Sequence, residues 1–208
     1  MEWLILLIAV ATVAYWLVAR PNRSGPRPAY TDLSHLPPQF VVFDLETTGL
    51  DATRDEIIEF GAIRVNRDSD EHQTYQMLVK PSEKLSAKIV QLTGITQEML
   101  NTDGQLIGEA LEGFLDFAGT LPLVSFNAEF DMAFLHAAAS RHGRTVANPV
   151  SCALEMARRA WPRRKSYRLV DLAKDGSLDA ADAHRALADA HNAMIVYVAA
   201  SCVLGRSR

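Results

Sequence analysis

The sequence predicts an α/β or α+β domain built around a mixed β-sheet. Three strand candidates follow one another in the first third of the chain, and helical segments then alternate with two further short apolar strands. The first three candidates have no crossover helix between them, which argues against a plain doubly wound sheet. Apolar residues make up 49% of the 208 residues, enough to build a packed core.

The strand candidates differ in character. Residues 40–43 are a continuous apolar run, typical of a buried central strand. Residues 56–65 and 74–79 are rich in Ile, Val and Tyr, with a plausible turn at residues 68–70 between them. Later strands are expected at residues 121–126 and near Val150.

Helical periodicity covers most of the remaining chain. Residues 105–118 have the clearest pattern, with one apolar face formed by Leu106, Ala110, Leu111, Phe114 and Leu115. Residues 128–141 predict a second long helix that Gly143 ends. Further helices are expected over residues 84–92, 97–100, 169–173 and 185–204, and in the segment that ends at Ala160.

The N-terminus predicts a membrane anchor. Residues 3–19 contain no charged side chain and would span about 25 Å as a helix, near the short end for a bilayer crossing. Arg20, Arg23 and Arg27 follow, so the positive-inside rule predicts a single-pass protein of the inner (cytoplasmic) membrane whose domain faces the cytoplasm. A cleaved signal peptide and a buried core helix are the alternatives. Glu2 and the lack of an N-terminal Lys or Arg favour the anchor.

A linker is expected to follow the anchor. Residues 20–38 hold five of the nine prolines together with several arginines, a composition typical of an extended tether. Residues 39–204 then form the predicted globular domain.

The charge of the chain limits how it can bind nucleic acid. The formal net charge is -4, so binding to a polyanion requires a local basic patch or bound cations. Residues 158–168 supply such a patch, in which we expect Arg163, Arg164 and Lys165 to contact substrate and in which Trp161 and Tyr167 could stack on bases. The alternatives for this segment are a solvated loop or a contact with the membrane surface.

Four carboxylates occupy positions where a core would not favour them. Asp44 and Glu46 end the most apolar strand and point to the same side of it, where they repel unless a proton or cation lies between them. Asp131 shares a helix face with leucine and alanine, and Asp189 lies in an alanine-rich helix. Each acid alone is more often a turn former, a solvated residue or a salt-bridge partner.

Together the four acids indicate a metal site. Carboxylate oxygens suit Mg²⁺ or Mn²⁺, and two such ions can activate water and stabilise the attacking and leaving oxygens of a phosphodiester. His184 lies five residues before Asp189, and an imidazole with a pKa of about 6.5 can remove a proton from water near neutral pH.

These segments resemble the motifs of the DEDDh 3′–5′ exonucleases, the DnaQ-like group that includes the proofreading epsilon subunit of bacterial DNA polymerase III. The matching segments are residues 43–50 (FDLETTGL), 127–131 (NAEFD), 184–190 (HRALADA) and, less specifically, 92–96 (LTGIT). The resemblance extends over roughly residues 38–204. It implies a ribonuclease H-like fold with a five-stranded mixed sheet flanked by helices.

The resemblance also implies roles for individual residues. Asp44, Glu46 and Asp189 would bind two divalent metal ions, Mg²⁺ or Mn²⁺, and Asp131 would complete the site partly through water. His184 would be the general base, and it selects the DEDDh branch over the tyrosine-bearing branch. Thr47 and Phe130 would lie close to the terminal nucleotide, and the products would be nucleoside 5′-monophosphates.

The sequence departs from the family at two motif positions and leaves several functions open. Phe126 stands where many relatives have His, and Thr93 stands where some do. The resemblance links these positions to how the terminal base is held, so it leaves the substrate preference open. The expected substrate is a 3′ end of single-stranded DNA or RNA. The alternatives are an editing subunit of a DNA polymerase and a non-catalytic, membrane-tethered nucleic-acid-binding module. A homodimer is also possible.

Overall fold

The computed structural model describes residues 35–69, 71–175 and 185–205. The predicted anchor at residues 3–19, most of the predicted linker and His184 therefore lie outside the described residues.

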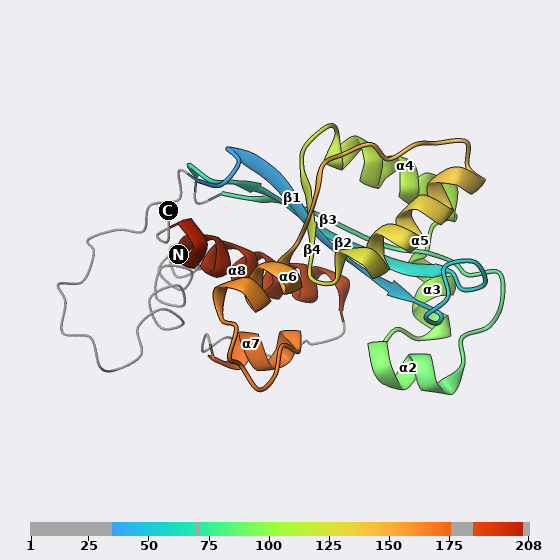
Figure 1. The fold of residues 1–208 in the computed structure, drawn as a ribbon. Coiled ribbons are helices and arrows are strands. Elements are labelled where there is room, and N and C mark those ends of the chain that lie inside the picture. Colours follow the sequence, from blue (N-terminus) through green and yellow to red (C-terminus); the bar gives the residue numbers. More distant parts are fainter. Residues whose placement is uncertain (1–34, 70, 176–184, 206–208) are drawn as a thin grey trace.

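Five strands form one mixed sheet in the order β3-β2-β1-β4-β5 (Figure 1). β1 (Gln39–Thr47), β2 (Ile57–Asn66) and β3 (Gln73–Leu78) pair antiparallel, whereas β4 (Leu123–Ser125) and β5 (Val150–Cys152) run parallel to β1. Short connections link the antiparallel strands, and helical connections lead to the parallel ones, as the geometry of each pairing requires. The predicted mixed sheet of five strands is confirmed.

Helices cover both faces of this sheet (Figure 1). α4 (Ile107–Ala118) and α5 (Ala128–Arg141) pack on one face. α8 (Ala186–Gly205) packs on the other face, with α6 (Ala153–Ala160) and α7 (Leu169–Asp175) beside it. The short helices α2 (Ala87–Thr93) and α3 (Gln97–Asp103) enclose Ile58 of β2 in a small separate cluster.

The alternation of side chains along β1 divides the core into two halves. Val41, Phe43 and Leu45 belong to the cluster formed with α4 and α5. Phe40 and Val42 belong to the cluster formed with α8. Because successive side chains of a strand point to opposite faces, the next even-numbered residues, Asp44 and Glu46, extend the row that faces α8.

α8 has an apolar composition because it is a core helix. It is the one helix in the described part of the chain that is long and apolar enough to cross a membrane, but 67% of its most apolar stretch is buried inside the domain. Most of its residues from Ala190 to Cys202 are buried against the sheet and α6.

One expectation about element boundaries was confirmed and one was wrong. β1 ends at Thr47, so Asp44 and Glu46 lie at the end of the strand, as expected. Leu106 was expected on the buried face of a helix, but it is 63% exposed and precedes α4 as its N-cap. The reason is that Gln105 pairs with Val79 in an isolated bridge, which delays the start of the helix.

Candidate active site

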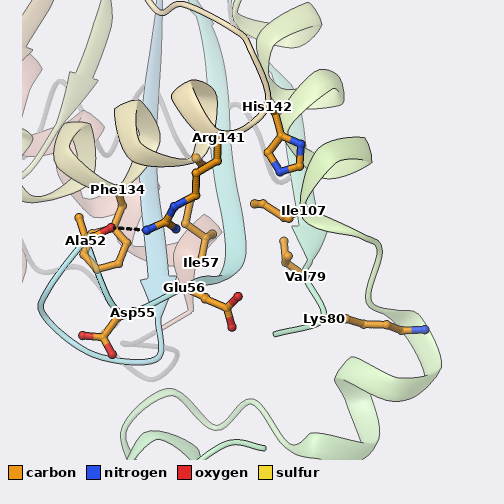
Figure 2. Close-up of a pocket in the computed structure, with 11 residues that line it drawn as sticks. Ala52, Asp55, Glu56, Ile57, Val79, Lys80, Ile107, Phe134, Arg141 and His142 are labelled. Atoms are coloured by element: carbon orange, nitrogen blue, oxygen red, sulfur yellow. Dashed lines mark hydrogen bonds between the residues drawn. The ribbon is translucent and has the colours of Figure 1, made fainter. Parts of the chain in front are cut away.

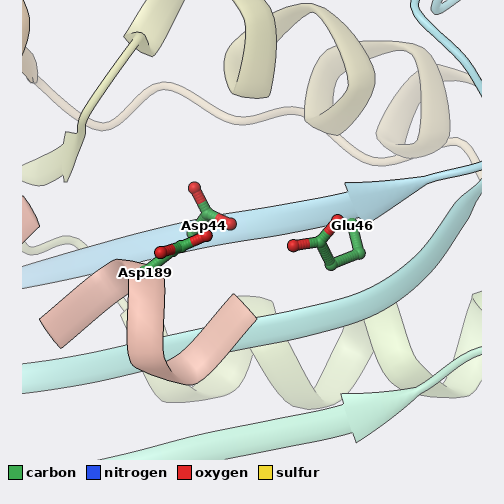
Figure 3. Close-up of side chains that lie close together, drawn as sticks. All are labelled: Asp44, Glu46 and Asp189. Carbon is green, nitrogen blue, oxygen red and sulfur yellow. The ribbon is translucent and has the colours of Figure 1, made fainter. Parts of the chain in front are cut away.

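Three of the four predicted acids come together between β1 and α8. Asp44 and Glu46 extend from β1, Asp189 extends from the first turns of α8, and the carboxylates lie close together (Figure 3). One oxygen from each of the three lies within 4.8 Å of the others. The pair on β1 follows from the i, i+2 spacing, and the packing of α8 on the sheet adds Asp189.

Asp44 and Glu46 are in an environment that opposes their charge. Burial, followed by repulsion from Asp131, Asp189, Glu46 and Glu59, raises the pKa of Asp44 well above its ordinary value. Burial, followed by repulsion from Asp189, raises the pKa of Glu46 to about 8. A divalent cation would relieve this repulsion, and carboxylate oxygens are the donors that Mg²⁺ and Mn²⁺ prefer, so these residues fit a metal site.

Asp131 is held beside this group rather than within it. It lies in the first turn of α5 and is buried. Its Oδ1 accepts the Leu45 backbone N–H at 3.2 Å, and its Oδ2 accepts the Ser125 hydroxyl. Burial raises the pKa of Asp131 to about 7 even though both hydrogen bonds act to lower it. Asp131 also repels Asp44, so the two carboxylates are electrostatically linked.

Of the predicted general base and the two predicted nucleotide contacts, the structure describes only the nucleotide contacts, Thr47 and Phe130. His184 lies outside the described residues, and Arg185 is the first residue described after it. Thr47 is buried at the end of β1, where its hydroxyl donates to the Gly49 carbonyl at 2.6 Å. Phe130 is half-buried in the first turn of α5, with its ring centroid 5.0 Å from that of Phe134.

Internal hydrogen bonds hold the loop that follows β1, and the loop exposes an apolar side chain. The Thr48 hydroxyl accepts the Glu56 N–H at 2.9 Å, and the Asp55 carboxylate accepts the Asp51 N–H at 2.8 Å. Leu50 in this loop is 87% exposed. The ordered loop therefore holds a large apolar side chain in solvent, a few residues beyond the acids of β1.

The predicted basic patch is only partly available to a ligand. Arg163 and Lys165 are exposed, and Arg164 is half-buried with its Nε donating to the Ser166 carbonyl at 3.2 Å. Trp161 and Tyr167 pack against a cluster formed by α6, α7 and α8. Their rings therefore pack between helices, whereas the sequence suggested that they could stack on bases.

Two hollows lie beyond the first motif. One of about 480 Å³ is lined mainly by polar residues of the loop after β1 and of residues 82–86. Another of about 80 Å³ lies between that loop and α5, where Arg141 Nη2 donates to the Ala52 carbonyl at 3.1 Å (Figure 2). Neither is lined by any of the predicted metal ligands.

Sequence reasoning missed Glu59, a fully buried carboxylate next to the site. It lies on β2 directly opposite Glu46, and its charge raises the pKa of both Asp44 and Glu46. A charged residue inside the apolar run 57–63 was the available signal.

Comparison with protein families gives a match to the model RNase_T, described as "Exonuclease", over residues 41–197. The chain is also 39% identical over 160 residues to DNA polymerase III PolC-type of Caldanaerobacter subterraneus subsp. tengcongensis, and 36% identical over 180 residues to that of Bacillus cereus. These matches cover 77% and 85% of this chain but only 11% and 12% of the relatives, so the chain spans about a tenth of their length.

Solved structures of E. coli exonuclease I share the fold. The zinc-bound complex with single-stranded DNA superposes with a TM-score of 0.68 at 20% identity, covering 78% of this chain and 40% of that one. The complex with a dT13 oligonucleotide has a TM-score of 0.66 at 22% identity, covering 83% and 42%.

Proposed function

The chain belongs to the exonuclease family of the RNase_T model, and on this premise we propose that it is a metal-dependent 3′–5′ exonuclease. It would hydrolyse the terminal phosphodiester of single-stranded DNA or RNA and release nucleoside 5′-monophosphates. The observation that carries the proposal is the group formed by Asp44, Glu46 and Asp189, whose carboxylate oxygens lie within 4.8 Å of one another.

Each acid has a proposed part in holding the metals. Asp44, Glu46 and Asp189 would bind Mg²⁺ or Mn²⁺ directly, and Asp131 would complete the site from α5. Bound divalent ions supply Lewis-acid stabilisation of phosphodiester oxygens and a lowered pKa for water. Ser125 and the Leu45 N–H orient the Asp131 carboxylate, so α5 and β1 keep a fixed relation at the site.

His184 is the proposed general base. It precedes Arg185 in the chain and is five residues before Asp189. An imidazole there accepts a proton from the attacking water. The support for this role is the spacing and the family resemblance of residues 184–190.

Substrate contacts are proposed on two sides of the acids. Thr47 and Phe130 lie at the end of β1 and the start of α5, close to where a terminal nucleotide would sit. Arg163, Arg164 and Lys165 contact phosphates farther along the strand. A local basic segment is needed because the chain as a whole carries a net charge of -4.

The cellular setting is a separate proposal. Residues 3–19 anchor the chain in the inner membrane, and residues 20–38 tether the domain on the cytoplasmic side. The similarity to DNA polymerase III PolC-type supports a second candidate, an editing subunit that associates with a DNA polymerase. A homodimer also remains a proposal.

The test is a cleavage assay on the full chain in a mild detergent. Single-stranded DNA and RNA of equal sequence carry a 5′ label, and each is incubated with Mg²⁺, with Mn²⁺ and with EDTA. We expect fragments that shorten from the 3′ end only with metal. Asp44→Ala and His184→Ala should abolish shortening, whereas Asp116→Asn, an exposed acid of α4, should not.

The direction of shortening and the two variants separate the possible outcomes. Shortening from the 5′ end, or activity retained by Asp44→Ala, would rule out the proposed mechanism. A folded protein that binds both strands without cutting either would favour the non-catalytic binding module. The faster substrate decides between DNA and RNA.

A further inference from the structure

The first turn of α8 rests directly on β2, next to the acids of β1. A Cβ added to Gly61 would lie 2.2 Å from the backbone of Ala186 and of Leu187. Gly61 is paired with Asp44, and Glu59 is paired with Glu46, so all four residues share the sheet face that α8 covers. The absence of a side chain at Gly61 lets the helix approach this closely.

Glu59 fixes the start of the helix at this contact. Its Oε1 accepts Arg185 Nη2 at 2.7 Å and Gln76 Nε2 at 2.9 Å. Its Oε2 accepts Arg185 Nε at 3.1 Å and the Ala186 backbone N–H at 3.0 Å. The guanidinium is therefore bound by both carboxylate oxygens, and the first backbone donor of α8 is capped by a residue 127 positions away in the chain.

These four hydrogen bonds determine what Glu59 can do. An ionised carboxylate offers about four lone-pair positions, and each is used by one of the four donors. Glu59 consequently has no free lone pair for a metal ion, although it lies opposite Glu46. Asp44, Glu46 and Asp189 form the group that could hold a metal, and Glu59 is not part of it.

The contact between Glu59 and Arg185 lies one helical turn from Asp189. The Asp189 N–H donates to the Arg185 carbonyl at 2.9 Å, so Arg185 begins the helical turn that carries Asp189. Resting on the function proposed above, we propose that Glu59 is a positioning residue that, through Arg185 and the Ala186 N–H, places Asp189 relative to the acids of β1.

The effect of removing Arg185 on metal binding distinguishes a positioning role of Glu59 from a direct electrostatic role, because the two roles predict opposite changes. If Glu59 acted on the metal through its charge or as a ligand, removing Arg185 would expose more negative charge and strengthen metal binding. If Glu59 acts by position, the loss of either partner releases α8 and weakens metal binding. Outer contacts of this kind typically change metal affinity or activity by about 10- to 100-fold.

The experiment measures Mn²⁺ binding to the full chain in detergent by isothermal titration calorimetry, together with exonuclease kinetics. The variants are Glu59→Gln, Arg185→Gln and the milder Arg185→Lys, which keeps the charge but loses the planar fork. Glu112→Gln is the matched control, because it breaks an ion pair with Arg144 that is about half exposed and belongs to other elements. Circular dichroism checks that each variant is folded.

We expect Glu59→Gln and Arg185→Gln each to weaken Mn²⁺ binding by about 10-fold or more. Arg185→Lys should give an intermediate loss, and Glu112→Gln should match the wild type. In the cleavage assay kcat should fall while KM changes little, because Glu59 is covered by α8 and cannot reach nucleic acid. The double variant Glu59→Gln/Arg185→Gln should lose no more than either single variant.

Two results would overturn the proposal. The first is unchanged Mn²⁺ affinity in Glu59→Gln. The second is unchanged or tighter binding in Arg185→Gln or Arg185→Lys alongside weaker binding in Glu59→Gln, which would make Glu59 a charge or ligand of the metal site. If Arg185→Gln does not fold, Arg185→Lys and the double variant carry the same comparison. A wild-type chain that binds Mn²⁺ but does not cut would contradict the proposed function alone.

Discussion

At the scale of single residues, Asp44 shows how a binding site can oppose stability. Burial and the charges of four other acids, Asp131, Asp189, Glu46 and Glu59, raise its pKa well above the ordinary value. Evolution tolerates such a group where a ligand compensates for it, and removing it commonly stabilises the protein at the expense of function.

We therefore expect Asp44→Asn to stabilise the metal-free protein by about 1 kcal/mol or more while abolishing Mn²⁺ binding. The amide keeps the shape of the side chain but removes one of the repelling charges. Thermal unfolding in EDTA and calorimetric titration with Mn²⁺ measure the two effects. Asp116→Asn is the control, and a lower Tm for Asp44→Asn in EDTA would contradict the argument.

The raised pKa values also predict how stability depends on pH. An acid whose folded pKa lies above its unfolded pKa binds more protons in the folded state, so stability falls as pH rises between the two values. Glu46, with a pKa of about 8, and Asp131, with a pKa of about 7, give the same sign. The metal-free protein should be less stable at pH 8 than at pH 5.

Unfolding in EDTA across this pH range, compared with the same series in Mn²⁺, measures the effect. Metal binding requires ionised carboxylates, so Mn²⁺ should restore stability mainly at the high-pH end. Stability that rises from pH 5 to pH 8 without metal would show that the acids are not held as described.

At the scale of elements, β1 serves the core and the site at once. Its odd-numbered residues pack under α4 and α5, and its even-numbered residues pass from apolar Phe40 and Val42 to the acids that face α8. β4 ends at Ser125, so the Leu45 N–H beyond its last pairing with β1 is free to donate to Asp131. The site therefore forms where the parallel pairing stops.

The contact between β2 and α8 can be tested by volume alone. Gly61→Ala should destabilise the protein by about 1 to 3 kcal/mol, since the added methyl meets helix backbone at 2.2 Å and neither partner is a flexible side chain. Gly108→Ala in α4 is the control, because its Cβ would meet only the His142 ring at 3.3 Å. Urea unfolding measures both, and equal stability of the two variants would contradict the close packing.

The proposed phosphate contacts of the basic segment between α6 and α7 can be tested by the salt dependence of nucleic-acid binding. Replacing Arg163, Arg164 and Lys165 together by Ala should weaken binding to all single-stranded sequences and reduce the slope of log K against log salt by about 2, at roughly 0.7 per lost phosphate contact. Fluorescence anisotropy at several salt concentrations measures this slope. Arg144→Ala is the control, because Arg144 follows α5 and pairs with Glu112 of α4. An unchanged slope would assign the segment to the membrane surface or to solvent.

At the scale of the whole molecule, the domain matches only a small part of its large relatives. The chain corresponds to 11% of DNA polymerase III PolC-type of Caldanaerobacter subterraneus subsp. tengcongensis, and its predicted anchor and linker lie outside the residues that match the family. The proposed tether would place an exonuclease domain at the membrane, which a polymerase-bound editing subunit does not require.

The anchor can be tested by fractionation. The full chain should sediment with membranes and resist extraction by high salt and carbonate, whereas a chain that starts at residue 29 should stay in the supernatant. Processing at Ala9-Val10-Ala11, seen as a shortened mature mass, would support a cleaved signal peptide instead. The bounds of the domain at residues 39–204 remain a prediction that limited proteolysis can check.

The sequence by itself determined the features that depend on local spacing. The i, i+2 spacing placed Asp44 and Glu46 on one side of a strand, and helical periodicity placed Asp131 on a buried face. The order of strand and helix patterns, together with the family resemblance, indicated the mixed sheet. The start of α4 depended on the pairing of Gln105 with Val79, which a local pattern does not contain.

Only the tertiary structure decided which groups meet. In the sequence, Glu59 is a single acid within an apolar strand. Its contact with Arg185, 126 positions later, depends on the strand register and on how closely α8 approaches Gly61. The same packing brings Asp189 to Asp44 and Glu46. Spacing along the chain fixes the face of each side chain, whereas contacts between distant segments follow from the packing of the whole core, to which every element contributes.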